Sequence, residues 1–147
     1  MSPISTPLLL LQALKDHLQA LVSDNAQVKP TIHVGFLPPK DKDNENISEF
    51  PFIIIRPHVG KDQQDNSKIT VKLVFGTKSE DPEGFMDLFG IMEQVRFDLQ
   101  SRRIINRRFK MDLPYDWEFF EEQPYPEWYG QATTIWTLPA IQEEGLL

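Results

Sequence analysis

Residues 121–141, EEQPYPEWYGQATTIWTLPAI, change abruptly from a corner rich in proline and aromatic residues to an alternating pattern. From Gln131 onward, one set of alternate residues is small or apolar, and it consists of Ala132, Thr134, Trp136 and Leu138. Alternation with a period of two is typical of a strand that buries one face. We therefore expect a strand from Tyr129 to Leu138 that begins at a stiff corner and is ended by Pro139.

Three more strands are expected upstream. Phe52–Arg56, FIIIR, is a continuous apolar run, which predicts a central strand that is covered on both faces and ended by Pro57. Residues 68–76, KITVKLVFG, alternate clearly between apolar and polar side chains. The polar segment Lys61–Ser67 lies between these runs, so we expect a hairpin with a long tip. Thr31–Phe36 predicts a shorter strand.

Two helices are expected from capping signals and apolar spacing. Thr6 and Pro7 form an N-cap and a first-turn proline, and the helix that they begin should end near Asp24 and Asn25. Its apolar face consists of Leu11, Leu14, Leu18, Leu21 and Val22.

A second helix is predicted from Pro82 to Gln100, with Ser79 or Asp81 as its N-cap. Its apolar stripe consists of Phe85, Leu88, Phe89, Met92, Val95 and Leu99. The spacing of three and four residues predicts that this stripe lies on the sheet.

The remaining segments complete an α+β arrangement. Arg107–Leu113 is a further strand candidate and Trp117–Phe120 a weaker one. We expect a mostly antiparallel sheet with both main helices packed on one face, in a single domain over residues 1–147. Lys40–Glu49 has almost no apolar content and is expected to be a mobile loop.

Composition excludes several classes of site. The chain has 147 residues, no cysteine and a formal net charge of -7. A disulfide framework, a thiolate zinc site and a cysteine nucleophile are therefore excluded. Leu8–Leu11 is a short apolar run without a basic leader, so we expect neither a signal peptide nor a membrane span.

The charge is unevenly distributed. Residues 102–110, RRIINRRFK, contain five of the fifteen basic residues and no acid, namely Arg102, Arg103, Arg107, Arg108 and Lys110. One interpretation is a nucleic-acid patch with Phe109 stacking on a base. The preferred one is a helix C-terminus that favours cations, followed by a strand with an exposed basic face, because the acidic body opposes nucleic-acid binding.

A third interpretation uses both signs of charge. The chain also has an acidic span without an intervening base, formed by Asp112, Asp116, Glu118, Glu121, Glu122 and Glu127. The basic segment of one copy would meet the acidic span of the next in a head-to-tail ring.

No pattern of catalytic or metal-binding residues emerges. His17, which lies on the polar side of the first helix, is expected to be solvated, and His58 to be a loop residue, while His33 completes no ligand pair. Asp41, Asp43 and Glu45 alternate as in a calcium loop, but the glycine and the final glutamate are missing. No phosphate loop and no nucleophile elbow occur. We expect no catalytic, cofactor-binding or metal-binding residues, and the rival is a metal-dependent hydrolase or nuclease that uses the acidic span.

Three segments in this order resemble a known family. They are FPFIIIRP at Phe50–Pro57, TKSEDPEGFMDLFGIMEQVRFDL at Thr77–Leu99 and EEQPYPEWYGQATTIWTLP at Glu121–Pro139. Together they resemble the small tail terminator, or tail completion, proteins of bacteriophages and prophages. The family's general fold is shared with head-tail joining proteins, so a head-tail connector or tube protein is the nearest alternative.

The resemblance implies an α+β protomer that forms a hexameric ring on the head-proximal end of the tail tube. Its partners would be copies of itself, the tube protein and the head-tail connector, in the bacterial cytoplasm during assembly and then in the virion tail. DNA would pass through the ring without specific binding, and an acidic lumen would let it slide. The family brings no catalytic residues and no cofactor.

The proline and aromatic corner has two interpretations at this stage. Its residues are Pro124, Tyr125, Pro126, Trp128 and Tyr129. They form a stiff apolar corner that either seats the last strand in the core or contacts a neighbouring subunit or partner, as Arg102, Arg103, Arg107 and Arg108 would.

Overall fold

The structure is a computed structural model that describes residues 5–25, 29–39 and 48–143. The mobile loop expected at Lys40–Glu49 lies outside these ranges apart from its last two residues. The elements in chain order are α1 (Pro7–Asn25), β1 (Thr31–Val34), β2 (Phe52–Asp62), β3 (Asn66–Lys78), α2 (Phe85–Arg102), β4 (Ile104–Ile105), β5 (Phe109–Phe119) and β6 (Glu127–Pro139).

The strands form one six-stranded sheet in the order β1-β2-β3-β6-β5-β4. β1 pairs with β2 in parallel, and all other neighbours are antiparallel. The sheet is therefore mixed and mostly antiparallel, which confirms the expected α+β class. β3 and β6 pair over their whole lengths, from Asn66 opposite Pro139 to Lys78 opposite Glu127, and form the centre of the sheet.

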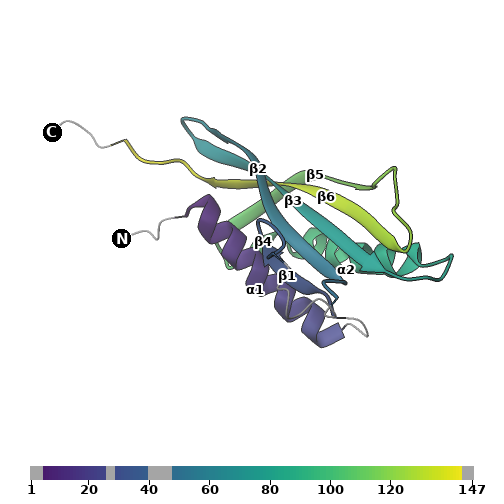
Figure 1. The fold of residues 1–147 in the computed structure, drawn as a ribbon. Coiled ribbons are helices and arrows are strands. Elements are labelled where there is room, and N and C mark those ends of the chain that lie inside the picture. The colour runs from purple at the N-terminus through teal and green to yellow at the C-terminus, as the bar shows by residue number, and fades with distance from the viewer. Residues whose placement is uncertain (1–4, 26–28, 40–47, 144–147) are drawn as a thin grey trace.

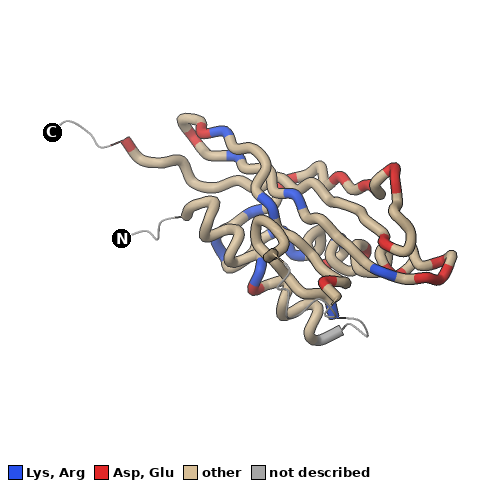
Figure 2. The backbone as a smooth tube through the Cα atoms, in the orientation of Figure 1, with Lys and Arg blue, Asp and Glu red and all other residues tan. Residues whose placement is uncertain are grey.

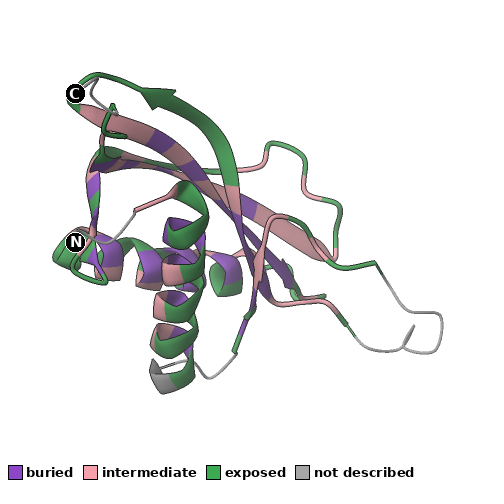
Figure 3. Cartoon of the chain, turned by 90° about the vertical axis from the view of Figure 1, so that its left-hand side faces the viewer, coloured by how far each residue is buried: buried purple, intermediate pink, exposed green. Residues whose placement is uncertain are grey.

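Both helices pack on the same face of the sheet, as predicted (Figure 1). The alternating residues of β3 and β6 supply the sheet side of this core, and the apolar faces of α1 and α2 supply the other side. Figure 3 shows buried residues along the inner sides of both helices. Trp136 of β6 is fully buried, and its indole N–H donates to Thr134 Oγ1 at 2.8 Å, so its only polar group has a hydrogen-bond partner.

The opposite face of the sheet carries a smaller apolar cluster. Phe52, Ile54 and Val74 are buried there, and Leu37, Phe50, Phe120 and Tyr129 pack against them. β2 is thus covered on both faces, as its continuous apolar run predicted. We call this side the helix-free face.

Pro57 does not end β2, contrary to the prediction. The strand continues to Asp62, and the register with β3 shifts between Pro57 and Val59. β1 pairs with β2 only as far as Ile55, so Pro57 lies on an open edge where its missing N–H costs no ladder bond. As a result the polar segment 61–67 is mostly strand, and the hairpin tip is short rather than long.

The predicted start of α1 is confirmed, whereas that of α2 is wrong. Leu9 N–H donates to Thr6 Oγ1 at 3.2 Å, which confirms the cap of α1. In α2 neither Ser79 nor Asp81 is the N-cap, because the helix begins later, after Gly84. Asp81 instead accepts the N–H of Glu83 at 2.9 Å, so Asp81 and the proline that follows it form a turn before the helix.

The segment after α2 also differs from the prediction. Arg107 and Arg108 lie in a turn between β4 and β5, and the two predicted strands are one strand, β5, with a register shift between Asp112 and Asp116. The register shift breaks the alternation of side chains on which the prediction depended, so the single strand looked like two. Among the described residues, no helix has the length and apolar content needed to cross a membrane.

Candidate interaction surface

The proline and aromatic corner lies between β5 and β6 and fastens another loop. Trp128 Nε1 donates to the carbonyl of Ser79 at 3.1 Å, and Ser79 N–H donates to the carbonyl of Pro126 at 2.9 Å. The Tyr125 hydroxyl donates to the carbonyl of Glu80. The corner therefore holds the β3–α2 turn, and we call these contacts the aromatic clasp.

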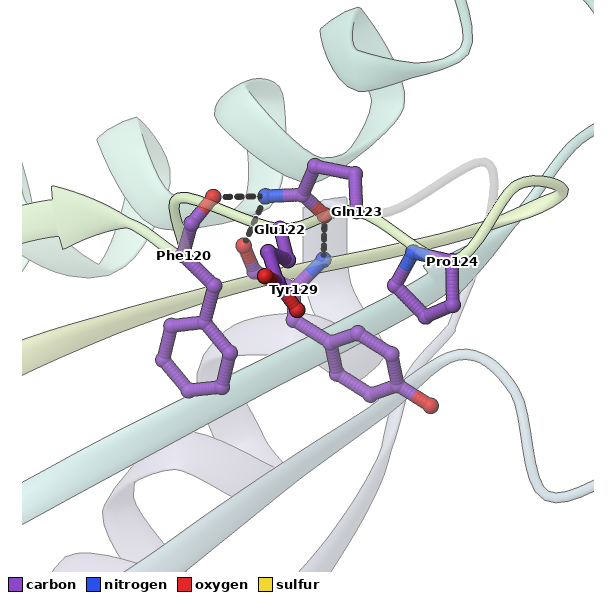
Figure 4. A pocket seen from close by; sticks show the side chains of 5 residues that line it. All are labelled: Phe120, Glu122, Gln123, Pro124 and Tyr129. Carbon is purple, nitrogen blue, oxygen red and sulfur yellow. Dashed lines mark hydrogen bonds between the residues drawn. The ribbon is translucent and has the colours of Figure 1, made fainter.

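Gln123 closes the same corner from within. Its side-chain N–H groups donate to the carbonyls of Phe120 at 2.7 Å and Tyr129 at 2.8 Å, and its Oε1 accepts the N–H of Tyr129 at 2.7 Å (Figure 4). One amide thus satisfies three backbone groups at the point where β5 ends and β6 begins. This arrangement gives the loop a defined shape without regular secondary structure.

An open hollow of about 490 Å³ lies beside this loop on the helix-free face. It is lined by Phe120, Glu122, Gln123, Pro124 and Tyr129 (Figure 4). The rings of Phe120 and Tyr129 are stacked, with centroids 6.0 Å apart. Burial, followed by the hydrogen bond to Glu127 and its charge, raises the pKa of the Tyr129 hydroxyl.

The clasp gathers exposed carboxylates at one end of the molecule. Glu80, Asp81 and Glu83 lie in the β3–α2 turn, and Glu121 and Glu122 lie in the β5–β6 loop. Figure 2 shows these acidic residues at the right-hand end of the chain, with one basic segment at the end of β3. We call this surface, with these five residues, the acidic end.

The predicted basic residues lie at the other end of the sheet, around the C-terminus of α2 and the β4–β5 turn. We call Arg102, Arg103, Arg107, Arg108 and Lys110 the basic end. Arg102 Nε donates to Asp98 Oδ1 at 3.1 Å, and Arg108 lies over the Phe109 ring at 5.5 Å. Phe109 is buried, so it cannot stack on a base, and that part of the nucleic-acid interpretation is wrong.

The structure does not bring the two groups of predicted interface residues together. β6 runs from the aromatic clasp at Glu127 to the end of the sheet where Lys110 pairs with Thr137. The strand has 13 residues, which corresponds to roughly 40 Å. A copy of the chain therefore presents opposite charges at distant ends, and surfaces of opposite charge are electrostatically complementary.

The histidines occupy different environments. His17 is not solvated as predicted, because its Nε2 lies 2.5 Å from Asp98 Oδ2 and connects α1 to α2. His58 lies within β2, not in a loop, and is exposed. Burial, with a smaller effect from the charge of Lys15, lowers the pKa of His33, so the neutral form is favoured.

The acidic span does not converge on a common point. Asp112 accepts from Lys68 Nζ at 2.9 Å and from the Thr137 hydroxyl, far along β6 from Glu127. Burial tends to raise the pKa of Asp112, but these hydrogen bonds and the charges of Lys68 and Lys110 outweigh it and lower the pKa. No group of three or more His, Asp or Glu side chains within the described ranges is placed to share a metal ion.

Sequence reasoning missed part of the acidic end. Asp81 is predicted from the sequence only as a possible N-cap, and the position of Glu80, Asp81 and Glu83 beside the β5–β6 loop depends on the contacts of Trp128 and Tyr125. The available signal was the short acidic run SEDPE, which follows the strand directly. Comparisons of the chain with protein-family models and with curated proteins find no match.

Proposed function

We propose that the chain is a structural subunit of a bacteriophage or prophage tail. Its role is that of the tail terminator, which caps the tail tube as a ring and offers a surface to the head-tail connector. The separation of an acidic end from a basic end carries this proposal, because a ring of identical copies needs two different, complementary surfaces on each copy. The resemblance in three ordered segments is the basis for proposing a location in the tail and a hexameric ring.

The aromatic clasp supports the proposal through rigidity. Ordering a loop on binding costs conformational entropy, so loops that are already held in shape bind with a smaller penalty. Trp128 and Tyr125 fix the β3–α2 turn, and Gln123 fixes the β5–β6 loop. Tyr125 and Pro124 remain exposed on the outside of the clasp, where a partner can reach them.

The metal-enzyme rival needs several carboxylates around one ion. Asp112 is engaged with Lys68, while Glu127 accepts the Tyr129 hydroxyl at 2.6 Å. These two members of the acidic span serve as hydrogen-bond acceptors at opposite ends of β6. The arrangement favours assembly over hydrolysis.

The test combines sedimentation velocity with negative-stain imaging, on the chain alone and with tail tubes of the phage or prophage that encodes it. We expect rings, or caps on tube ends, that form equally well with and without a chelator. Raised ionic strength should weaken the contact between copies, since exposed charges are screened. Binding to purified connectors but never to tubes would instead assign the chain to the connector.

A strict monomer, even with tubes present, would refute the proposal. A reproducible metal-dependent turnover that is lost in Glu121→Gln or Glu122→Gln, with the fold intact, would favour the enzyme. Glu121 and Glu122 are exposed in the loop and take no part in the clasp contacts, so the fold should survive either substitution. Because both residues also belong to the acidic end, turnover and not association is the readout that separates the two roles.

A further inference from the structure

The basic end contains two arginines in a backbone conformation that side chains disfavour. Arg103 follows α2 with φ 56°, and its N–H donates to the carbonyl of Leu99 at 2.8 Å. Asn106 and Arg107 have φ values of 55° and 57°, and Arg108 N–H donates to the carbonyl of Ile105 at 3.2 Å. Positive φ at both central positions defines the tight hairpin turn between β4 and β5.

Glycine is the usual residue at both arginine positions. The residue after a helix that adopts the left-handed conformation is mostly glycine, and the second central position of this turn is typically glycine after asparagine. Asn106 is in its usual place, whereas Arg107 is not. A left-handed backbone brings the Cβ of an L-residue too close to the following carbonyl, so each arginine lowers the stability of the folded chain.

The two side chains gain no internal contact that offsets this strain. Neither the Arg103 nor the Arg107 side chain makes a hydrogen bond or ion pair with another described residue. Both are exposed, as are Arg102 and Lys110 of the same segment. The fold requires the left-handed backbone at both positions but does not require arginine there, and strained residues of this kind cluster at functional surfaces.

We propose that Arg103 and Arg107 form a docking surface for the acidic end of a second copy of this chain. The inference rests on the proposed function and adds to it which two surfaces meet. The partner surface is the acidic end, whose five carboxylates are exposed and are held on two fastened loops. Arginine is suited to this contact, since its planar guanidinium binds a carboxylate through two parallel hydrogen bonds.

The tight turn fixes the backbone positions from which the arginine side chains extend. Ile105 pairs with Phe109, so the connection is only Asn106, Arg107 and Arg108, and the backbone of Arg107 is held at the end of the sheet. Arg103 is fixed in the same way by its bond to Leu99. The backbone is therefore held in place on both partners, and the entropic penalty of association falls mainly on the arginine side chains.

The first experiment separates stability from association. In Arg103→Gly and Arg107→Gly the strain is relieved, so we expect the thermal midpoint to rise by about 2 to 4 °C. We expect self-association, measured by sedimentation velocity, to weaken by about tenfold for each variant. Lys15→Gln on the exposed side of α1 changes the net charge equally and should leave association unchanged.

The second experiment identifies the partner surface. One variant carries Arg103→Glu and Arg107→Glu, and the other carries Glu80→Arg and Glu83→Arg. Each variant alone should remain monomeric, because the two substituted side chains then face residues of their own charge on the next copy. An equal mixture should associate, since the reversed end of one variant complements the reversed end of the other.

Two results would overturn the inference. A glycine variant with a lower thermal midpoint would mean that the arginine side chains stabilise the fold. A mixture that stays monomeric while the wild type associates would mean that the arginines bind something else, such as a polynucleotide. In that case the proposed function survives. A wild type that stays monomeric at every soluble concentration and does not bind tail tubes would refute both the proposed function and this inference.

Discussion

The two ends of the molecule are built in different ways. At the acidic end, Trp128, Tyr125 and Gln123 use side-chain hydrogen bonds to hold two loops against each other. At the basic end, Arg103 and Arg107 are held by a helix terminus and a tight turn, and their side chains take no part. From this comparison we expect folded stability to depend on the aromatic side chains at one end and to be reduced by the two arginines at the other.

The largest expected effect is at Trp128, the centre of the clasp. Trp128→Ala removes a half-buried ring and its hydrogen bond to Ser79, and we expect the free energy of unfolding to fall by about 3 kcal/mol. Urea unfolding measures the change. Trp117→Ala is the matched control, since Trp117 is 47% exposed and should lose about 1 kcal/mol. Equal losses would contradict a special role for the clasp.

Gly84 offers a smaller change at the same end. A Cβ at this position would lie 2.7 Å from Trp128 Nε1 and 2.7 Å from Ser79 Cβ, so Gly84→Ala should destabilise the fold by about 2 kcal/mol. Gly90 lies in α2 with no atom within 4 Å of an added Cβ. Gly90→Ala should therefore stabilise the protein by about 0.5 to 1 kcal/mol, as measured by the same urea unfolding. Two changes of the same sign would argue against close packing around Gly84.

Asp112 extends the comparison to the end of the sheet that carries Lys110. Because its folded pKa lies below the ordinary value of 3.8, its contribution to stability is complete above that value and is lost as pH falls through the folded pKa. Asp112→Asn should cost about 1 kcal/mol at pH 7 and progressively less as the solution is acidified below 3.8. Urea unfolding at successive pH values measures the difference from the wild type.

Asp116→Asn is the control for that series. Asp116 is exposed on the same strand and has no hydrogen bond to a described basic side chain. Its substitution should leave the stability within about 0.5 kcal/mol of the wild type at every pH. If Asp112→Asn behaved in the same way, the network with Lys68 and Thr137 would contribute nothing measurable.

The smallest expected effect isolates one bond of the clasp. Tyr125→Phe removes only the hydroxyl that donates to Glu80, on a side chain that is 59% exposed, so we expect a loss of about 0.5 kcal/mol. Hydrogen exchange at the Ser79 amide, which donates to Pro126, should become faster as the turn loosens. An unchanged exchange rate would show that Trp128 alone holds the turn.

Local patterns predicted most of the elements. The alternation in Lys68–Gly76 placed β3, and the three- and four-residue spacing placed α1 and α2 with their buried faces. These predictions succeed because side-chain direction repeats every two residues in a strand and every 3.6 in a helix. Burial of one face therefore produces a periodic pattern of apolar residues within a short segment. Two predictions failed. A register shift at Pro57 lets β2 continue past the proline, and a separate turn before Phe85 delays the start of α2.

The candidate surface was predicted less completely. The basic residues and the aromatic corner were identified by their composition, but the role of Trp128 in holding Ser79 joins positions 49 residues apart. His17 was expected to be solvated and instead meets Asp98 across 81 residues. Such pairs depend on how the helices cross and how the strands are ordered, and no local pattern encodes either.

The amino-acid sequence by itself determined the class of fold, the absence of cysteine chemistry and the presence of opposite charges in separate segments, because each follows from composition or short-range periodicity. Only the tertiary structure decided that β6 lies between β3 and β5, that two acidic loops share one end, and that Arg103 and Arg107 stand at the other. Pairing between distant strands is selected by burial of the whole apolar face at once, and the positions of the charges follow from that pairing.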